Sequence, residues 1–319
     1  MGIVLILEDL TAEVPDTNAY YFNFKKFSND DKKRVLMYGY DSPTSKLLSG
    51  KLSNYRKFFF NNWAPCEFAQ ESDHNNKGPM DYDEKFDVIY SICPHTVEWL
   101  NGLKLGREYR YIFYPFCETL IPEQQEKKYD VIYHGGIHGK EHVGCIKAIR
   151  KFNYRYCTMT HHINNLTIHF LPYATNTNLL FKDKIKLIAQ TKISICYNMV
   201  HVHKEHIPRI KSRPEYKNNL AFSAIESLGI MPQFKTRIHE AAISRTLNLV
   251  RRDKWNVIEN YYTPNEHFIY FEDEAGLQNK LKEILNDWEN YQPIIDNAYN
   301  KALEYTTEKF IDKIKKESN

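Results

Sequence analysis

The sequence predicts an α/β protein built from two open, parallel sheets. Apolar runs of strand length alternate with amphipathic segments of helix length, which is the pattern of βαβ units. The 319 residues exceed the ~150 that form one ordinary domain. Hydrophobic residues at 42% and charged residues at 26% are values of a folded globular chain. We therefore expect two domains, each with its own core.

The first series of elements occupies the N-terminal third of the chain. Its predicted strands are "RVLMYGY" (34–40), "FDVIYSI" (86–92) and "YRYIFYPF" (109–116). Its predicted helical segments are "DSPTSKLLSGKLSNYRKFFF" (41–60) and "CPHTVEWLNGL" (93–103). The polar stretch 117–130 reads as a linker, which separates a domain of residues 1–120 from one of residues 121–319.

The second series gives six predicted strands. They are "DVIYHGG" (130–136), "YRYCTMT" (154–160), "LTIHFLP" (166–172), "KISICYN" (192–198), "LNLVRR" (247–252) and "FIYFED" (268–273). Two tandem Rossmann-like domains of this kind predict a ligand in a cleft, because ligands of open α/β sheets lie outside the carboxyl ends of the strands.

Composition excludes several classes of function. A formal charge of +3 is too small for a nucleic-acid-binding surface, so any anion site must be local. Six cysteines without a CxxC spacing favour free thiols in a reducing compartment, and we expect a cytoplasmic protein. No apolar run reaches 18 residues, so a transmembrane segment is not expected. The basic amphipathic run "KFIDKIKKES" (309–318) is compatible with peripheral membrane contact, although a helix packing back onto the first domain is favoured.

A glycine-rich turn follows the first strand of the second series, in "YHGGIHGKEHVGCIKAI" (133–149). Gly135 and Gly136 permit close backbone approach, and Lys140 begins a predicted helix whose free N–H groups and dipole favour an anion. The motif matches neither GxxxxGK[ST] nor GxGxxG. A phosphate cradle and a plain tight turn are both open interpretations.

A basic cluster stands at the start of a second helix, in "PQFKTRIHEAAISRTLNLV" (232–250). Lys235 and Arg237 oppose the helix dipole, which favours an external anion such as a pyrophosphate. Glu240 shares a helix face with Arg237 and could accept hydrogen bonds from the vicinal hydroxyls of a ribose. An exposed ion pair between Arg237 and Glu240 is the alternative.

The segments "TRIHEAAISRTLNLV", "NEHFIYFEDEAGLQNKLKEILND" and "AYNKALEYTTEKFIDKI" resemble the C-terminal half of group-1 glycosyltransferases, especially their spore-maturation (CgeB-type) branch. The resemblance implies the GT-B fold, with a nucleotide-sugar donor held by residues 121–319 and an acceptor, a glycan or another hydroxyl compound, served by residues 1–120. By the resemblance, Glu240 contacts the donor ribose and Arg237 lies near the diphosphate. It also implies catalysis without a metal or another cofactor.

Two positions depart from the family pattern. Pro232 stands where many retaining members carry a second glutamate that contacts the donor sugar, and Arg245 stands where the family usually has glycine after the helix. A non-catalytic relative that binds a nucleotide sugar or a glycan therefore stays open beside the glycosyltransferase. A nucleotide-binding interaction module is a third interpretation.

Histidines supply the remaining candidates. His95 follows a predicted strand at the start of a helix, where it could act as a catalytic base or merely cap the helix. The segment "HVHKEH" (201–206) contains three histidines, but their spacing is only a weak signal for a metal site.

Overall fold

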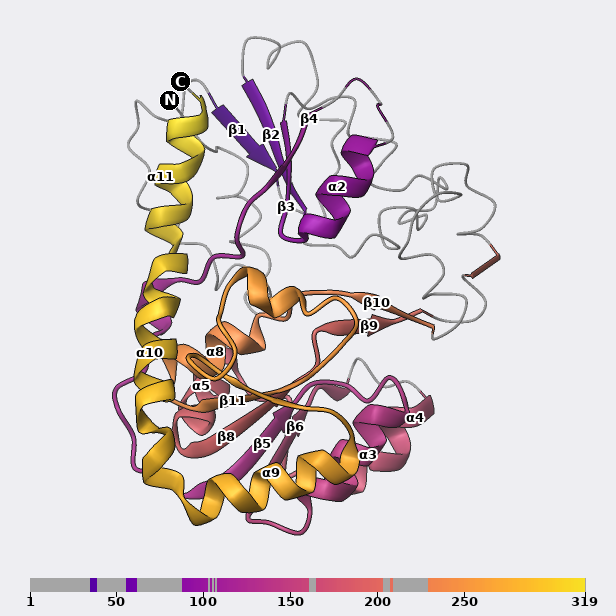
Figure 1. Cartoon of the computed structure of the whole chain (residues 1–319), viewed down its shortest axis with the longest axis vertical. Coiled ribbons are helices and arrows are strands. Elements are labelled where there is room, and N and C mark those ends of the chain that lie inside the picture. Colours follow the sequence, from indigo (N-terminus) through magenta and orange to yellow (C-terminus); the bar gives the residue numbers. More distant parts are fainter. Residues whose placement is uncertain are drawn as a thin grey trace. The chain divides into compact units, whose positions relative to one another are not determined.

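The computed structural model describes residues 35–38, 56–61, 88–102, 104, 106, 108–160, 165–202, 207–208 and 229–318 (Figure 1). The chain forms two compact units. Unit 1 contains Met1–Pro115, Val200–Gln233 and Thr307–Asn319. Unit 2 contains Phe116–Met199 and Phe234–Thr306. Both contain parallel β-sheets, so the predicted α/β class is confirmed.

The first unit contains a four-stranded parallel sheet in the order β1-β2-β3-β4. Its elements are β1 (Val35–Tyr38), β2 (Arg56–Asn61), β3 (Val88–Ser91), α2 (Pro94–Gly102) and β4 (Glu108–Tyr111). The prediction that residues 56–60 continue a helix was wrong, because this segment is β2. Consecutive Phe58, Phe59 and Phe60 suit a strand, because aromatic residues have a high β-propensity.

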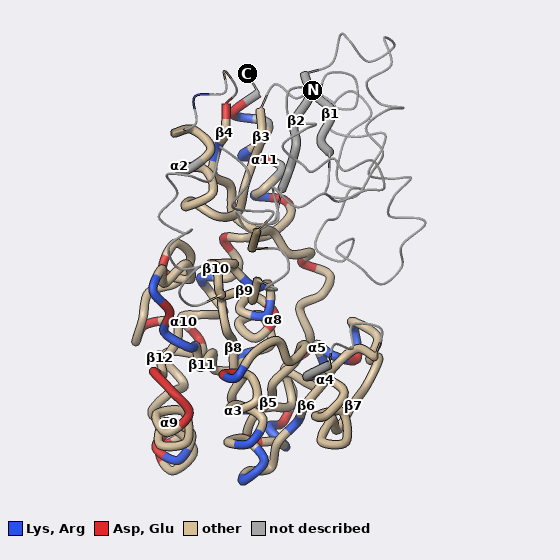
Figure 2. The backbone as a smooth tube through the Cα atoms, turned by 90° about the vertical axis from the view of Figure 1, so that its right-hand side faces the viewer, with Lys and Arg blue, Asp and Glu red and all other residues tan. Residues whose placement is uncertain are grey.

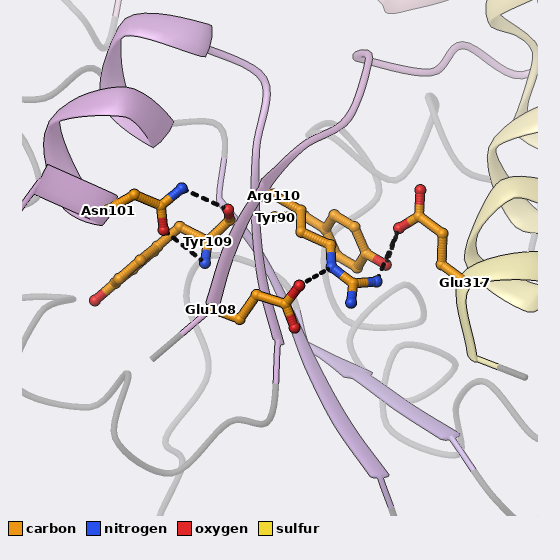
Figure 3. Close-up of polar contacts among 6 residues, drawn as sticks. All are labelled: Tyr90, Asn101, Glu108, Tyr109, Arg110 and Glu317. Carbon is orange, nitrogen blue, oxygen red and sulfur yellow. Dashed lines mark hydrogen bonds and ion pairs between the residues drawn. The ribbon is translucent and has the colours of Figure 1, made fainter. Parts of the chain in front are cut away.

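The C-terminal helix α11 (Thr307–Ser318) is attached to this first sheet by a buried phenol. The Tyr90 hydroxyl donates to Glu317 Oε2 at 2.6 Å, and Arg110 Nη1 lies 3.5 Å from the same oxygen (Figure 3). Burial and the neighbouring carboxylate both raise the pKa of Tyr90, so the phenol stays protonated as the donor. Unit 1 also includes β10 (Ile230–Pro232), which pairs with β9 (Met199–His201).

The second unit contains a six-stranded sheet in the order β12-β11-β8-β5-β6-β7, and all its strand pairs are parallel. The strands are β5 (Tyr129–His134), β6 (Tyr154–Thr158), β7 (Asn176–Thr177), β8 (Thr191–Cys196), β11 (Leu247–Arg251) and β12 (Ile269–Phe271). Numbered within the unit, this order is 6-5-4-1-2-3, which is the order of the doubly wound Rossmann fold.

Helices cover both faces of the second sheet (Figure 1). They are α3 (Lys140–Ile149), α4 (Asn165–Phe170), α5 (Phe181–Ala189), α8 (Arg237–Ile243), α9 (Glu274–Asn286) and α10 (Gln292–Ala302). Short 3₁₀ turns η8 (Glu118–Leu120), η10 (Leu171–Tyr173), η12 (Val257–Asn260), η13 (Trp288–Tyr291) and η14 (Leu303–Tyr305) complete the connections. The helix α9 carries both basic and acidic residues (Figure 2).

Small residues seat α8 on its sheet, as the sequence indicates. Ala241 is fully buried in a core cluster with Ile132 of β5, Cys157 of β6 and Ile185 and Ile188 of α5. Because alanine adds almost no width to a helix, the backbone of α8 can approach the strands closely.

One predicted strand of the second series was wrong. The run 166–172 forms α4 and η10, although its apolar residues alternate as they would in a strand. Ile168 is 53% exposed, so this alternation does not mark a buried face.

Candidate functional site

The strand order places a candidate ligand site at the carboxyl ends of β5 and β8. These two strands are neighbours, and the chain continues from β5 to β6 on one side and from β8 to β11 on the other. At such a reversal the connections leave in opposite directions and open a crevice, where doubly wound sheets bind their ligands.

The turn that follows β5 depends on glycine. Gly135 has a φ of +141°, which other residues rarely adopt. The hydroxyl of Tyr133 donates to the carbonyl of Gly136 at 2.8 Å and holds the turn from within the core. Gly139 then caps α3, which begins at Lys140, as the sequence predicts. Lys140 is exposed.

The guanidinium of Arg237 lies directly over Gly135. A Cβ on Gly135 would be 2.1 Å from Arg237 Nη2 and 2.5 Å from Cζ, so a side chain at residue 135 is incompatible with this position. Arg237 also lies 5.6 Å from the ring centre of Tyr133. Two segments separated by about a hundred residues, proposed independently as anion-binding, therefore meet at one point.

A histidine that sequence reasoning did not select lies over the second glycine. A Cβ on Gly136 would be 2.5 Å from His138 Nε2. The backbone N–H of His138 donates to Nδ1 of the buried His142 at 3.4 Å. The sequence signal that could have selected His138 is its position between the two glycines of the turn and the N-cap residue of α3.

Lys235 is brought to the same edge of the sheet by a backbone contact. Its N–H donates to Asn198 Oδ1 at 3.0 Å, and Asn198 follows the carboxyl end of β8. The segment that leads into α8 is thereby fixed to the β8 side of the reversal, while Arg237 reaches the β5 side.

Glu240 is buried, with a side chain that is 3% exposed. Its Oε2 lies 2.9 Å from Lys184 Nζ of α5 and 3.5 Å from His134 Nδ1, and its Oε1 accepts from Thr236 Oγ1 at 3.3 Å. The alternative of an exposed Arg237–Glu240 ion pair therefore does not describe this carboxylate. Sequence gave no indication of Lys184, because nothing local connects α5 with α8.

His134 is neutral in this arrangement. Burial lowers its pKa to about 3, although the adjacent Glu240 opposes that shift. Its Nδ1 faces Glu240 and its Nε2 lies 3.4 Å from the Ser194 hydroxyl. A neutral imidazole can donate to the carboxylate and accept from the serine, so it links the glycine turn to α8 and β8.

The end of α8 explains how Arg245 replaces a glycine. Arg245 has a φ of +50°, in the left-handed region, and its N–H donates to Ala242 O while the next N–H, of Thr246, donates to Ala241 O. These bonds form a Schellman motif. An ion pair of 2.8 Å to Asp296 and the ring of Tyr299, 3.8 Å away, hold the arginine there. The chain therefore forms a left-handed turn after α8 with a residue other than glycine.

The other sequence candidates are not in the second unit's cluster or are not described. His95 belongs to the first unit, where it is the second residue of α2 and is half-buried. His203 and His206 are outside the described residues. In the described ranges, no group of three or more His, Cys, Asp or Glu side chains is arranged to hold a metal ion. No helix among the described residues is long and apolar enough to span a membrane.

Comparison with known proteins relates this architecture to a set of solved structures. No protein-family model matches the sequence, and a search of curated proteins finds no match. TarM superposes with a TM-score of 0.59 at 9% identity, covering 89% of this chain and 54% of TarM. The pneumococcal O-GlcNAc transferase GtfA, solved with UDP and GlcNAc, gives 0.53 at 10% identity, covering 89% of this chain and 56% of GtfA. HepE from Anabaena, solved with UDP, gives 0.55 at 8% identity, covering 89% and 78%.

These similarities show the GT-B fold of glycosyltransferases, as the resemblance implied. They do not show a relation to the spore-maturation (CgeB-type) branch. The chain spans just over half the length of TarM and GtfA.

Proposed function

We propose that this chain is a glycosyltransferase that moves a sugar from a nucleotide-diphosphate donor to a glycan or another hydroxyl acceptor. The observation that carries the proposal is the Arg237 guanidinium over Gly135 at the carboxyl end of β5. The donor diphosphate is the ligand that this point of the fold suits best.

The chemistry of the turn favours a diphosphate. A guanidinium presents several N–H donors in a planar fork that matches phosphate oxygens. The N–H groups at the start of α3 and the dipole of this ten-residue helix add to the positive potential. Lys140, the first residue of α3, and Lys235, whose backbone is bonded to Asn198 after β8, are proposed as further cationic groups of the site.

The same groups would serve the reaction. Transfer of the sugar breaks the bond between its anomeric carbon and the diphosphate, and negative charge grows on the leaving oxygen. Fixed cationic donors beside that oxygen lower the barrier by stabilising the charge as it develops. The donor is the only small molecule besides the acceptor that the proposal requires.

One further role rests on the sequence resemblance, by which Glu240 contacts the donor ribose. His95 is proposed from its position in the chain, because it follows β3 at the start of α2, where it would serve as base for the acceptor hydroxyl. His95→Gln should then lower turnover without changing diphosphate affinity, whereas a residue that only caps the helix would leave turnover unchanged. The similar structures of GtfA and HepE, solved with UDP, support a uridine nucleotide as the first donor to test.

A second candidate is a non-catalytic protein that binds a nucleotide sugar or a glycan. Pro232 favours it, because no carboxylate is available at this position to contact the donor sugar. Both candidates need the diphosphate site, and release of free or transferred sugar from a panel of UDP-sugars separates them.

Calorimetry tests the site itself. Each of UDP, GDP, ADP and CDP is titrated beside its nucleoside into the full chain, into Arg237→Ala and into Arg150→Ala. Arg150 is a matched control, because it is exposed at the opposite end of α3. Arg237→Ala should weaken binding of the preferred diphosphate by about 10- to 100-fold, which is about 1.5–3 kcal/mol for charge-assisted hydrogen bonds, and the control should not. The proposal is wrong if no diphosphate binds more tightly than its nucleoside.

A further inference from the structure

The imidazole of His138 lies on the same glycine turn as the Arg237 guanidinium. A Cβ on Gly136 would be 2.5 Å from Nε2, 3.2 Å from Cε1 and 3.3 Å from Cδ2 of this ring. Gly136, unlike Gly135, does not have a positive φ, so its backbone does not require glycine. What glycine provides at residue 136 is room for the ring.

The backbone beneath the ring is anchored, while residue 138 itself is exposed. His142, which accepts the N–H of His138, is 3% exposed and lies 4.7 Å from the ring of Tyr197 and 5.9 Å from that of Tyr133. The exposed imidazole is therefore carried on a turn that buried aromatic rings hold in place.

Two nitrogen-bearing side chains therefore lie over adjacent glycines: Arg237 over Gly135 and His138 over Gly136. The titratable and charged groups of the segments that form this turn are Tyr133, Lys140, Glu141, His142, Tyr197 and Arg237. Arg237 and Lys140 oppose protonation of an imidazole on this turn and the Glu141 carboxylate favours it, so a bound polyanion shifts the balance towards imidazolium. Imidazole is the side chain whose charge changes between pH 5 and 8.

We propose that His138 is a second phosphate-contacting residue, which takes up a proton when a diphosphate binds. This inference rests on the proposed function, because it assigns a further contact within the same site. In the free protein the imidazole is neutral. When one diphosphate binds, the imidazole takes up one proton from solution, and the resulting imidazolium donates a hydrogen bond to a phosphate oxygen. Donor binding then strengthens as pH falls through the range in which imidazole titrates.

Calorimetry with UDP at pH 6 and pH 8 tests this in the full chain, in His138→Gln and in His169→Gln. His169 is the matched control, an exposed histidine on α4. UDP itself titrates between pH 6 and pH 8, and this contributes equally to the results for all three proteins. The ratio of Kd at pH 8 to Kd at pH 6 is therefore compared between each variant and the unmodified chain. The ratio should fall about five- to tenfold in His138→Gln and stay unchanged in His169→Gln.

His138→Arg supplies a fixed charge at the same place. It should bind UDP at pH 8 more tightly than the unmodified chain does at pH 8, and it should take up less proton on binding when titrations in two buffers of different ionisation enthalpy are compared. Equal pH ratios in the unmodified chain, His138→Gln and His138→Arg would overturn the inference. The proposed function would survive that result if UDP still bound more tightly than uridine and Arg237→Ala abolished the difference.

Discussion

Lys184 Nζ lies 2.9 Å from Glu240 Oε2, and this pair joins α5 to α8. The Glu240 side chain is 3% exposed and the Lys184 side chain is 23% exposed. Because water solvates the lysine in part and the carboxylate hardly at all, Glu240 needs the ion pair more than Lys184 does. A residue proposed to bind a ribose is therefore also part of the core that positions Arg237.

Glu240→Gln should lower the free energy of unfolding by about 1–3 kcal/mol, because it leaves Lys184 without its charged partner in a largely buried site. Urea denaturation measures the change. Glu283→Gln is the control, since Glu283 pairs with Lys280 on the exposed face of α9 and should cost less than about 1 kcal/mol. Equal losses in the two variants would contradict a structural role for the buried pair.

Gly135→Ala should weaken UDP binding at least about tenfold, because the new Cβ would be 2.1 Å from Arg237 Nη2 and would displace the charged donor. The positive φ of Gly135 adds a stability loss of about 1–3 kcal/mol. Gly136→Ala is the comparison for stability, since Gly136 does not have a positive φ and its Cβ meets His138 rather than Arg237. Melting temperature and UDP affinity are measured together, and an unchanged affinity in Gly135→Ala would place the diphosphate elsewhere.

Acid should destabilise the second unit through His134. Its folded pKa of about 3 lies below the ordinary value of about 6.5, so between these values the unfolded chain binds a proton that the folded chain does not. Stability is therefore lost as pH falls through this window, by at most about 2 kcal/mol between pH 7 and pH 5. Urea unfolding of the unmodified chain and of His134→Gln at both pH values measures the difference. A stability that rises on acidification more in the unmodified chain than in the variant would mean that Glu240 holds His134 protonated.

Tyr90→Phe should loosen the attachment of α11 to the first sheet. It removes the 2.6 Å hydrogen bond to Glu317 but keeps the buried ring, so the expected loss is about 1–2 kcal/mol. Glu317→Gln should lose a similar amount, because the bond is weakened from the other side. Hydrogen exchange of the α11 amides is the measurement, and unchanged protection in both variants would show that apolar packing alone holds the helix.

The sequence by itself determined the class of fold and the segments that form the site. Alternation of strand-length and helix-length runs is local, and it correctly located β5, β6, β8, β11 and β12. It failed where a short apolar run fits either structure, at residues 56–60 and 166–172, because only burial against neighbours distinguishes a strand from a helix there. Gly135, Gly136, Lys140, Lys235 and Arg237 were selected because glycine and charge at element ends have local physical meaning.

Only the tertiary structure decided which of these residues meet. The order of strands in a sheet depends on packing between segments far apart in the chain, and this order brings Arg237 onto Gly135. It also buries Glu240 against Lys184 and His134, which a surface helix pattern could not reveal. His138 was visible in the sequence as one histidine among thirteen, and its position over Gly136 distinguishes it, because contact with a glycine backbone is a property of three-dimensional packing.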